Sequence, residues 1–97
     1  SGEDLLFQVM LDLGIELSSS IRNEELGGRN CWIVDDGYLI ACFDKDVNET
    51  TIEEMAKLLP THLVIRDASA VTDNVLDNFD QIIESYSSEK AIKTHVL

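Results

Sequence analysis

The chain has 97 residues, which is room for one small domain. Its 19 acidic residues against seven Lys and Arg give a net charge of −12, which disfavours direct binding to nucleic-acid phosphates or to an anionic membrane surface. With 44% hydrophobic residues the chain is too apolar for a disordered tail, yet no apolar run reaches the roughly 20 residues of a membrane span. Cys31 and Cys42 both lie in apolar runs, which favours two buried thiols and a cytoplasmic protein.

The beginning of the chain resembles a cut fragment rather than a natural start. It opens with Ser1-Gly2, without methionine, and a helical pattern follows almost at once. Apolar spacing predicts a helix over Glu3–Leu13, whereas the polar segment Ser18–Gly28 is expected to be a connection. We therefore predict a single domain, cut from a larger protein, with an N-terminal helix in residues 1–14 and an α/β core in residues 29–97.

The middle of the chain predicts a β-hairpin. Two apolar runs, 31–34 and 38–43, flank the turn sequence Asp35-Asp36-Gly37. An Asp-Gly pair between β-rich runs is a strong hairpin signal, because glycine supplies the positive φ that a tight turn needs. The first run is expected to form a strand at or near the edge of the sheet, and the continuously apolar second run is expected to be buried on both faces.

After the hairpin, helical and strand patterns alternate. Thr50 and Glu53 fit a capping box for a helix that must end before Pro60. The remaining predicted segments are a strand over 62–66, a helix over 71–86 and a strand over 91–96. Alternation of this kind implies parallel strands joined by right-handed crossovers. The predicted fold class is α/β, with a small mixed sheet made of a β-hairpin followed by β-α-β-α-β, and with helices packed on the sheet.

One loop of the predicted fold lies where open α/β sheets commonly bind ligands. Asp67 and Ser69 follow a predicted parallel strand and precede a helix. The loop has no phosphate-wrapping glycines, so binding of a small molecule or phosphoryl group and simple helix capping both remain open. His62 and His95 fall on separate predicted strands, and each is expected to be an ordinary satisfied or solvent-facing histidine. No nucleophile arrangement and no metal-ligand spacing is present, so no catalytic, cofactor-binding or metal residue is predicted.

Two groups of residues are candidates for protein contacts. At about 100° per residue, four acidic residues of the last predicted helix share one side. They are Asp73, Asp77, Asp80 and Glu84. This acidic ridge is either a solvated outer face or a docking face for a basic partner. Trp32 and Tyr38 lie near the expected sheet edge, where they would serve either as interface anchors or as core packing.

The order of segments carries a resemblance to a known family. It rests on the run Trp32-Ile33-Val34-Asp35-Asp36-Gly37-Tyr38-Leu39-Ile40-Ala41-Cys42-Phe43, the acidic linker and helix Asp44–Leu59, the strand and loop Leu63–Ser69, then Asp73 and Asn78, and the closing Ile92-Lys93-Thr94. On these residues the chain resembles the C-terminal region of the modification subunit of type III restriction–modification systems. Those subunits are adenine-specific DNA methyltransferases that use S-adenosylmethionine.

The resemblance implies a role without catalysis for this chain. The family's Asp-Pro-Pro-Tyr box for the flipped adenine and its Phe-x-Gly-x-Gly box for the methyl donor are both missing here. The chain would then be an accessory or assembly domain that contacts a second modification subunit or the restriction subunit, with no membrane association. Its parent enzyme would bind DNA and S-adenosylmethionine through other segments. The alternatives are a domain that only packs on its parent's catalytic domain, and an autonomous small-molecule or phosphoryl-binding domain that uses the Asp67–Ser69 loop.

Overall fold

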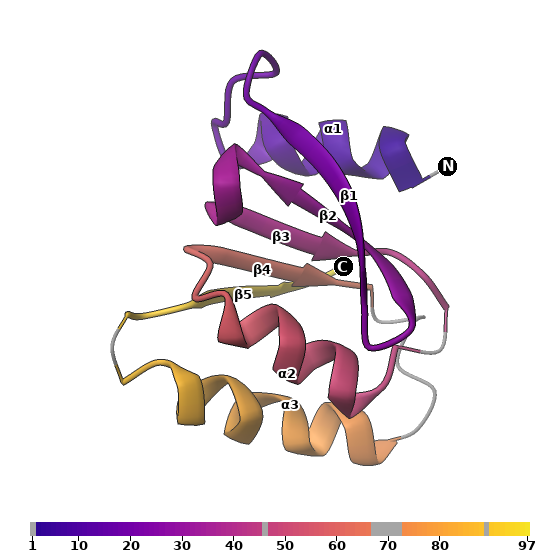
Figure 1. Cartoon of the computed structure of the whole chain (residues 1–97), viewed down its shortest axis with the longest axis vertical. Helices are drawn as coiled ribbons and strands as arrows, with labels where there is room; N and C mark the ends of the chain where they lie inside the picture. Colours follow the sequence, from indigo (N-terminus) through magenta and orange to yellow (C-terminus); the bar gives the residue numbers. More distant parts are fainter. Residues whose placement is uncertain (1, 46, 67–72, 89) are drawn as a thin grey trace.

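A computed structural model of the chain describes residues 2–45, 47–66, 73–88 and 90–97. Three α-helices, five strands and one short 3-10 turn follow one another along this part of the chain (Figure 1). Their bounds are α1 (Gly2–Asp12), β1 (Ile21–Leu26), β2 (Arg29–Val34), η1 (Asp35–Gly37), β3 (Leu39–Cys42), α2 (Glu49–Lys57), β4 (His62–Ile65), α3 (Asp73–Tyr86) and β5 (Lys93–Val96).

The strands form one mixed sheet in the order β1-β2-β3-β4-β5. The pairs β1–β2 and β2–β3 are antiparallel, whereas β3–β4 and β4–β5 are parallel. The turn Asp35-Asp36-Gly37 joins β2 to β3, as the Asp-Gly signal predicts, and α2 and α3 make the two crossovers. The predicted fold class is therefore confirmed.

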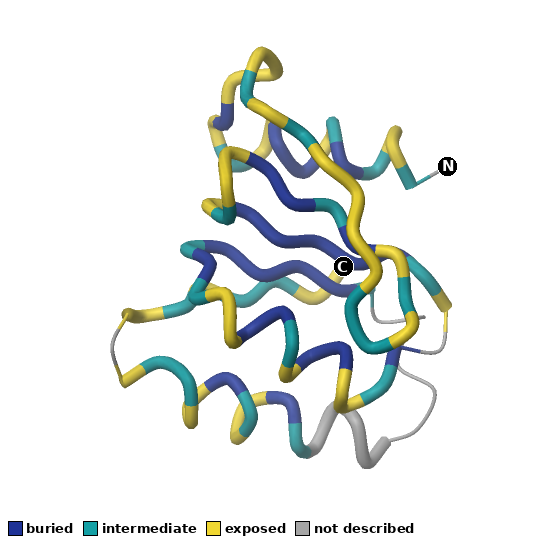
Figure 2. The backbone as a smooth tube through the Cα atoms, viewed as in Figure 1, coloured by how far each residue is buried: buried dark blue, intermediate teal, exposed yellow. Residues whose placement is uncertain are grey.

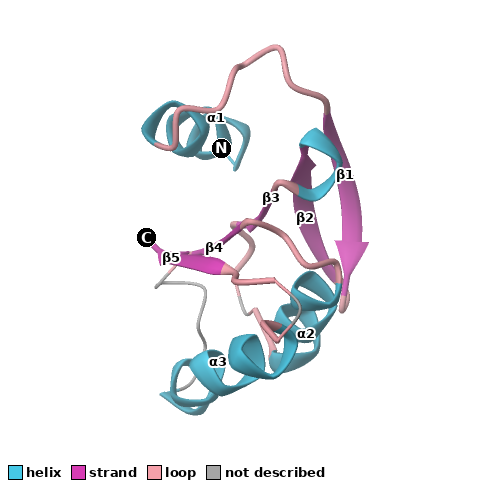
Figure 3. Cartoon of the chain, turned by 90° about the vertical axis from the view of Figure 1, so that its left-hand side faces the viewer, coloured by secondary structure: helices cyan, strands magenta, loops and turns pink. Residues whose placement is uncertain are grey.

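Helices cover both faces of the sheet (Figure 3). Alternate residues of β3 point to opposite sides: Ile40 and Cys42 join the core beneath α2 and α3, and Leu39 and Ala41 join the core beneath α1. Every residue of β3 and β4 is buried, whereas the two outermost strands, β1 and β5, are largely open to solvent (Figure 2). A strand buried on both faces needs an apolar residue at nearly every position, which explains the continuous runs in the sequence.

Strand β1 corrects the prediction that Ser18–Gly28 is only a connection. Ile21–Leu26 forms the strand. Its two end residues are half-buried, and the four residues between them are exposed. An edge strand that is exposed on both faces has no apolar side to present, so its polar sequence gives no alternating pattern. Because β1 lies outside β2, the run 31–34 lies one strand in from the sheet edge, in agreement with the prediction of a strand at or near the edge.

The start of helix α2 also differs from the prediction. Asn48 is the residue before the helix, and its side-chain oxygen accepts a hydrogen bond from the backbone N–H of Thr51 at 2.8 Å. The predicted capping box of Thr50 and Glu53 is therefore wrong, and both of these residues are exposed. Asn48 is favoured as the cap over Thr50 because its amide also donates to the carbonyl of Gly27 at 3.3 Å. This hydrogen bond connects the start of the helix to the β1–β2 turn.

Candidate functional site at the edge of the sheet

The outer edge of β5 carries backbone groups that face away from the sheet. The N–H of Lys93 donates to the carbonyl of Thr61 at 2.8 Å, and the N–H of Leu97 donates to Ile65 at 2.9 Å. Because a parallel ladder uses alternate residues, Thr94 and Val96 direct their N–H and C=O groups away from β4. No strand among the described residues lies on that side of β5. This edge is a template on which a further strand can pair.

The side chains at the two sheet edges differ in character. On β1 the exposed residues include Arg22, Glu24 and Glu25, and such charges discourage pairing with another strand. The β5 edge carries one exposed charge, Lys93, and ends on two aliphatic residues, since Val96 is 45% exposed and Leu97 is 52% exposed. Of the two edges, β5 is therefore the better suited to receive a partner.

Three aromatic rings form a row that leads across the sheet to this edge. The rings of Tyr38 and His62 meet edge-on, with centroids 5.3 Å apart and planes at 69°. The ring of His62 then faces that of His95, with Nδ1 of His62 3.0 Å from Nε2 of His95. Tyr38 stands directly before β3, so the row runs from β3 through β4 to β5.

The row lies on the α1 face of the sheet, beyond the reach of that helix. His62 is paired with Leu39, which belongs to the core beneath α1, and His95 is paired with Val64 of the same core. No residue of β5 contributes to that core among the described residues. We call the resulting surface the β5 shelf, and it consists of Tyr38, His62, Lys93 and His95.

The surroundings of the shelf favour the neutral form of His62. His62 is only 7% exposed, and burial lowers its pKa below the ordinary 6.5, with the nearby charges of His95 and Lys93 acting in the same direction. The 3.0 Å separation is a hydrogen-bond distance, so an N–H of one imidazole donates to a bare nitrogen of the other. The shelf is thus a polar aromatic surface on an otherwise acidic domain.

The two aromatic residues that the sequence indicates as candidates differ in exposure and in packing. Tyr38 is 39% exposed and belongs to the β5 shelf. Trp32 is half-buried and packs against the core beneath α1.

The structure describes the side chains of only two of the four residues of the acidic ridge. Asp80 and Glu84 are exposed on α3, where they are free to meet a partner or solvent. The side chains of Asp73 and Asp77, and the loop residues Asp67 and Ser69, lie outside those that the structure describes.

Sequence reasoning missed the pairing of His62 with His95. These residues are 33 positions apart, and each looks ordinary by itself. The predicted parallel strands 62–66 and 91–96 contained the signal, because neighbouring strands bring residues of one face within contact distance. What was missing was the register, since a shift of one residue would have placed the two rings on opposite faces.

The two cysteines behave as the sequence predicts. Both are free and fully buried. The register of β2 and β3, in which Trp32 faces Ala41, places Cys31 beside Cys42. The hydrogen bond between the two thiols, together with burial, raises the pKa of Cys31. Both thiols are enclosed by the core beneath α2 and α3, so they are buried structural cysteines.

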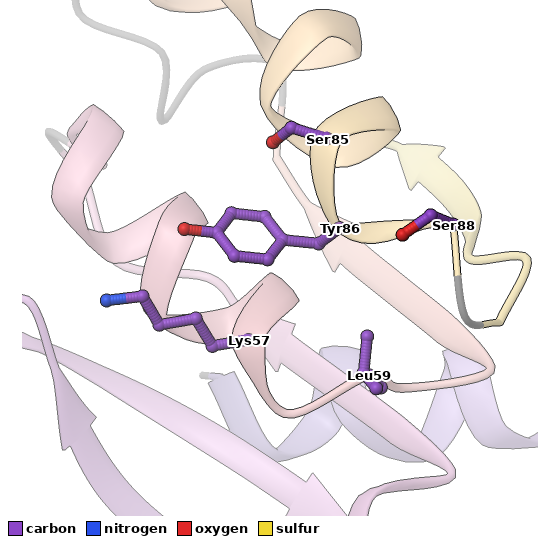
Figure 4. A pocket seen from close by; sticks show the side chains of 5 residues that line it. All are labelled: Lys57, Leu59, Ser85, Tyr86 and Ser88. Atoms are coloured by element: carbon purple, nitrogen blue, oxygen red, sulfur yellow. The ribbon is translucent and has the colours of Figure 1, made fainter.

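Two hollows on the described part of the surface are small. One lies where the ends of α2 and α3 meet and measures about 230 Å³ (Figure 4). It is lined by Lys57, Leu59, Ser85, Tyr86 and Ser88. A second, beside Tyr38 and Asp35, measures about 270 Å³. Sites for drug-sized ligands usually measure about 300–1,000 Å³, so neither hollow favours a small-molecule role.

No group of three or more His, Cys, Asp or Glu side chains in the described ranges could hold a metal ion. Within the same ranges, no helix has both the length and the apolar character needed to cross a bilayer. No family model matches the chain, and no curated protein matches it either.

Proposed function

We propose that this chain is a non-catalytic assembly domain that holds a protein partner at the β5 edge of its sheet. The observation that carries the proposal is the open edge itself. Thr94 and Val96 direct their backbone groups away from β4, where no other described strand lies, and Val96 and Leu97 expose aliphatic surface beside them. An extended segment that pairs with such an edge gains affinity from main-chain hydrogen bonds and specificity from the side chains on either face.

The resemblance to type III modification subunits suggests the setting. On this proposal the parent protein is a cytoplasmic DNA adenine methyltransferase that uses S-adenosylmethionine, and the domain contacts either a second modification subunit or the restriction subunit. The net charge of −12 supports a protein partner over direct contact with DNA. The same charge repels a second copy at long range, so self-association would depend on short-range pairing at the edge.

The first test is the solution mass of the chain, measured by light scattering over a concentration series. If the partner is a second copy, the wild type forms a dimer at micromolar concentration. Val96→Lys then returns it to a monomer, because a charged side chain at a sheet edge opposes strand pairing. Leu17→Lys is the matched control, since Leu17 is also exposed and aliphatic but lies between α1 and β1.

A monomeric wild type moves the test to the restriction subunit. Binding of the parent modification subunit to the restriction subunit is then measured by calorimetry, with the same two variants introduced into the parent. Loss of binding in Val96→Lys alone supports the β5 edge as the interface. The proposal is wrong if Val96→Lys leaves both dimer formation and restriction-subunit binding intact, or if the purified chain itself transfers a methyl group to adenine.

A further inference from the structure

We propose that His62 and His95 form a chelating pair for a divalent transition-metal ion of the copper, nickel or zinc class. The inference rests on one juxtaposition, two imidazole nitrogens that face each other across the parallel pair β4–β5. It is independent of the assembly role proposed above, because it concerns the α1 face of the sheet and not its backbone edge.

The spacing of the two nitrogens suits a shared metal ion. Nδ1 of His62 and Nε2 of His95 are 3.0 Å apart, and the ring centroids are 5.2 Å apart, so the nitrogens are turned toward each other. A metal–imidazole bond is about 2.0–2.1 Å long. Two such bonds at square-planar or tetrahedral angles place the nitrogens about 2.9–3.4 Å apart. An ion bound to both nitrogens would displace the N–H proton and lie about 1.4 Å from the line that joins them, so both rings must tilt until their lone pairs converge on it.

The backbone holds both rings in place before any ion arrives. The N–H of His62 donates to the carbonyl of Tyr38 at 2.9 Å, which fixes the first residue of β4. His95 lies between Lys93 and Leu97, whose N–H groups both bond to the β4 side. Tyr38 packs edge-on against the His62 ring and limits its rotation. A pair positioned in this way has little conformational freedom to lose when it binds an ion.

The ligand types select the class of metal. Imidazole nitrogen suits copper, nickel and zinc, whereas calcium and magnesium prefer oxygen ligands. No third His, Cys, Asp or Glu completes the site among the described residues. The remaining coordination positions would be filled by water or by a side chain of a bound partner.

One nearby charge acts against binding of a cation at this site. The ammonium group of Lys93 faces His62 from the neighbouring strand and repels a cation. Replacement of Lys93 should therefore strengthen binding, whereas replacement of either histidine should weaken it.

The experiment is a Ni²⁺ titration of the purified chain, followed by calorimetry and by NMR of the imidazole ring protons. The chain has only two histidines, so their signals and any histidine-dependent site are unambiguous. We expect one ion per chain and selective broadening of both histidine signals. His62→Gln and His95→Gln should each weaken binding about 10²-fold, because the second ligand no longer acts within the same molecule. Lys93→Gln is the matched control on the same face, and it should bind at least as tightly as the wild type.

Several outcomes would overturn the inference. One is the absence of binding by the wild type, and another is broadening that spares the histidine signals. Equal affinity of the wild type and both histidine variants would place the ion elsewhere on the acidic surface. If a variant fails to fold, as judged by circular dichroism, the broadening pattern of the wild type decides the question alone.

Discussion

At the scale of single residues, the β1–β2 turn shows how much two identical neighbours can differ. Gly27 and Gly28 both adopt positive φ, at 59° and 81°. A Cβ atom on Gly27 would lie 2.6 Å from the backbone nitrogen of Thr51, whereas nothing lies within 4 Å of the corresponding point on Gly28. The first glycine is therefore required by close packing on α2 as well as by its backbone conformation.

This difference predicts unequal costs for the same substitution. Gly28→Ala should cost only the conformational strain of about 1–2 kcal/mol. Gly27→Ala should cost about 1–3 kcal/mol more, because Thr51 and the start of α2 must move. It would also disturb the hydrogen bonds that Gly27 makes with Glu54, Asn48 and Thr51. The measurement is urea unfolding of both variants, and equal destabilisation would contradict this account.

Two long-range contacts could not be predicted from the sequence: the packing of the Gly27-Gly28 turn on α2, and the contact between His62 and His95. Gly27-Gly28 is recognisable as a turn, but nothing local shows that it packs on residues 48–54. His62 and His95 are recognisable as strand residues, but their contact depends on the register of two strands separated by a helix. Tyr38 could be selected as an aromatic candidate because its exposure follows from its place beside a turn.

At the scale of elements, helix α2 is fixed at its start by a single side chain. Asn48 caps the helix through Thr51, and its amide reaches Gly27 as well. Asn48→Ala should therefore destabilise the protein by about 1–2 kcal/mol, at the upper end of the range for lost N-caps. Thr50→Ala is the matched control, because Thr50 is exposed within the first turn and should change stability by less than about 0.5 kcal/mol.

Thermal unfolding of both variants distinguishes the two possible caps. A larger loss of stability in Thr50→Ala than in Asn48→Ala would restore the capping box that the sequence alone favours.

The elements that could be predicted are those with an apolar signature. Strands β3 and β4 are buried on both faces, and α3 has a strong apolar stripe, so each shows clearly in the sequence. Strand β1 has no such signature because solvent meets both of its faces. It forms because β2 has backbone groups available for antiparallel pairing and because the Gly27-Gly28 turn reverses the chain direction. Neither condition is a property of residues 21–26 themselves.

At the scale of the whole molecule, the charge of −12 acts against the folded state. Folding brings the acidic groups closer together than they are in the unfolded chain. The ion pairs that Arg22 makes with Glu24 and Asp36 are exposed and offset little of this repulsion. The unfolding temperature should therefore rise as sodium chloride shortens the screening length from about 30 Å at 0.01 M to about 10 Å at 0.1 M.

Scanning calorimetry at several salt concentrations measures this effect. The same series near pH 4 is the control, because protonation of carboxylates reduces the charge and should flatten the dependence on salt. A melting temperature that falls with salt at neutral pH would mean that local attractions outweigh the net charge.

The strand order of the sheet has a consequence for biosynthesis. The strands lie side by side in the same order as they occur along the chain, so each new strand docks on the one made just before it. The β1-β2-β3 meander uses only neighbouring segments and can form while later residues are still being translated. Strands β4 and β5 then extend the growing edge one at a time, each with its covering helix, and no strand has to insert between two that have already paired. The sheet can thus be built vectorially from the ribosome.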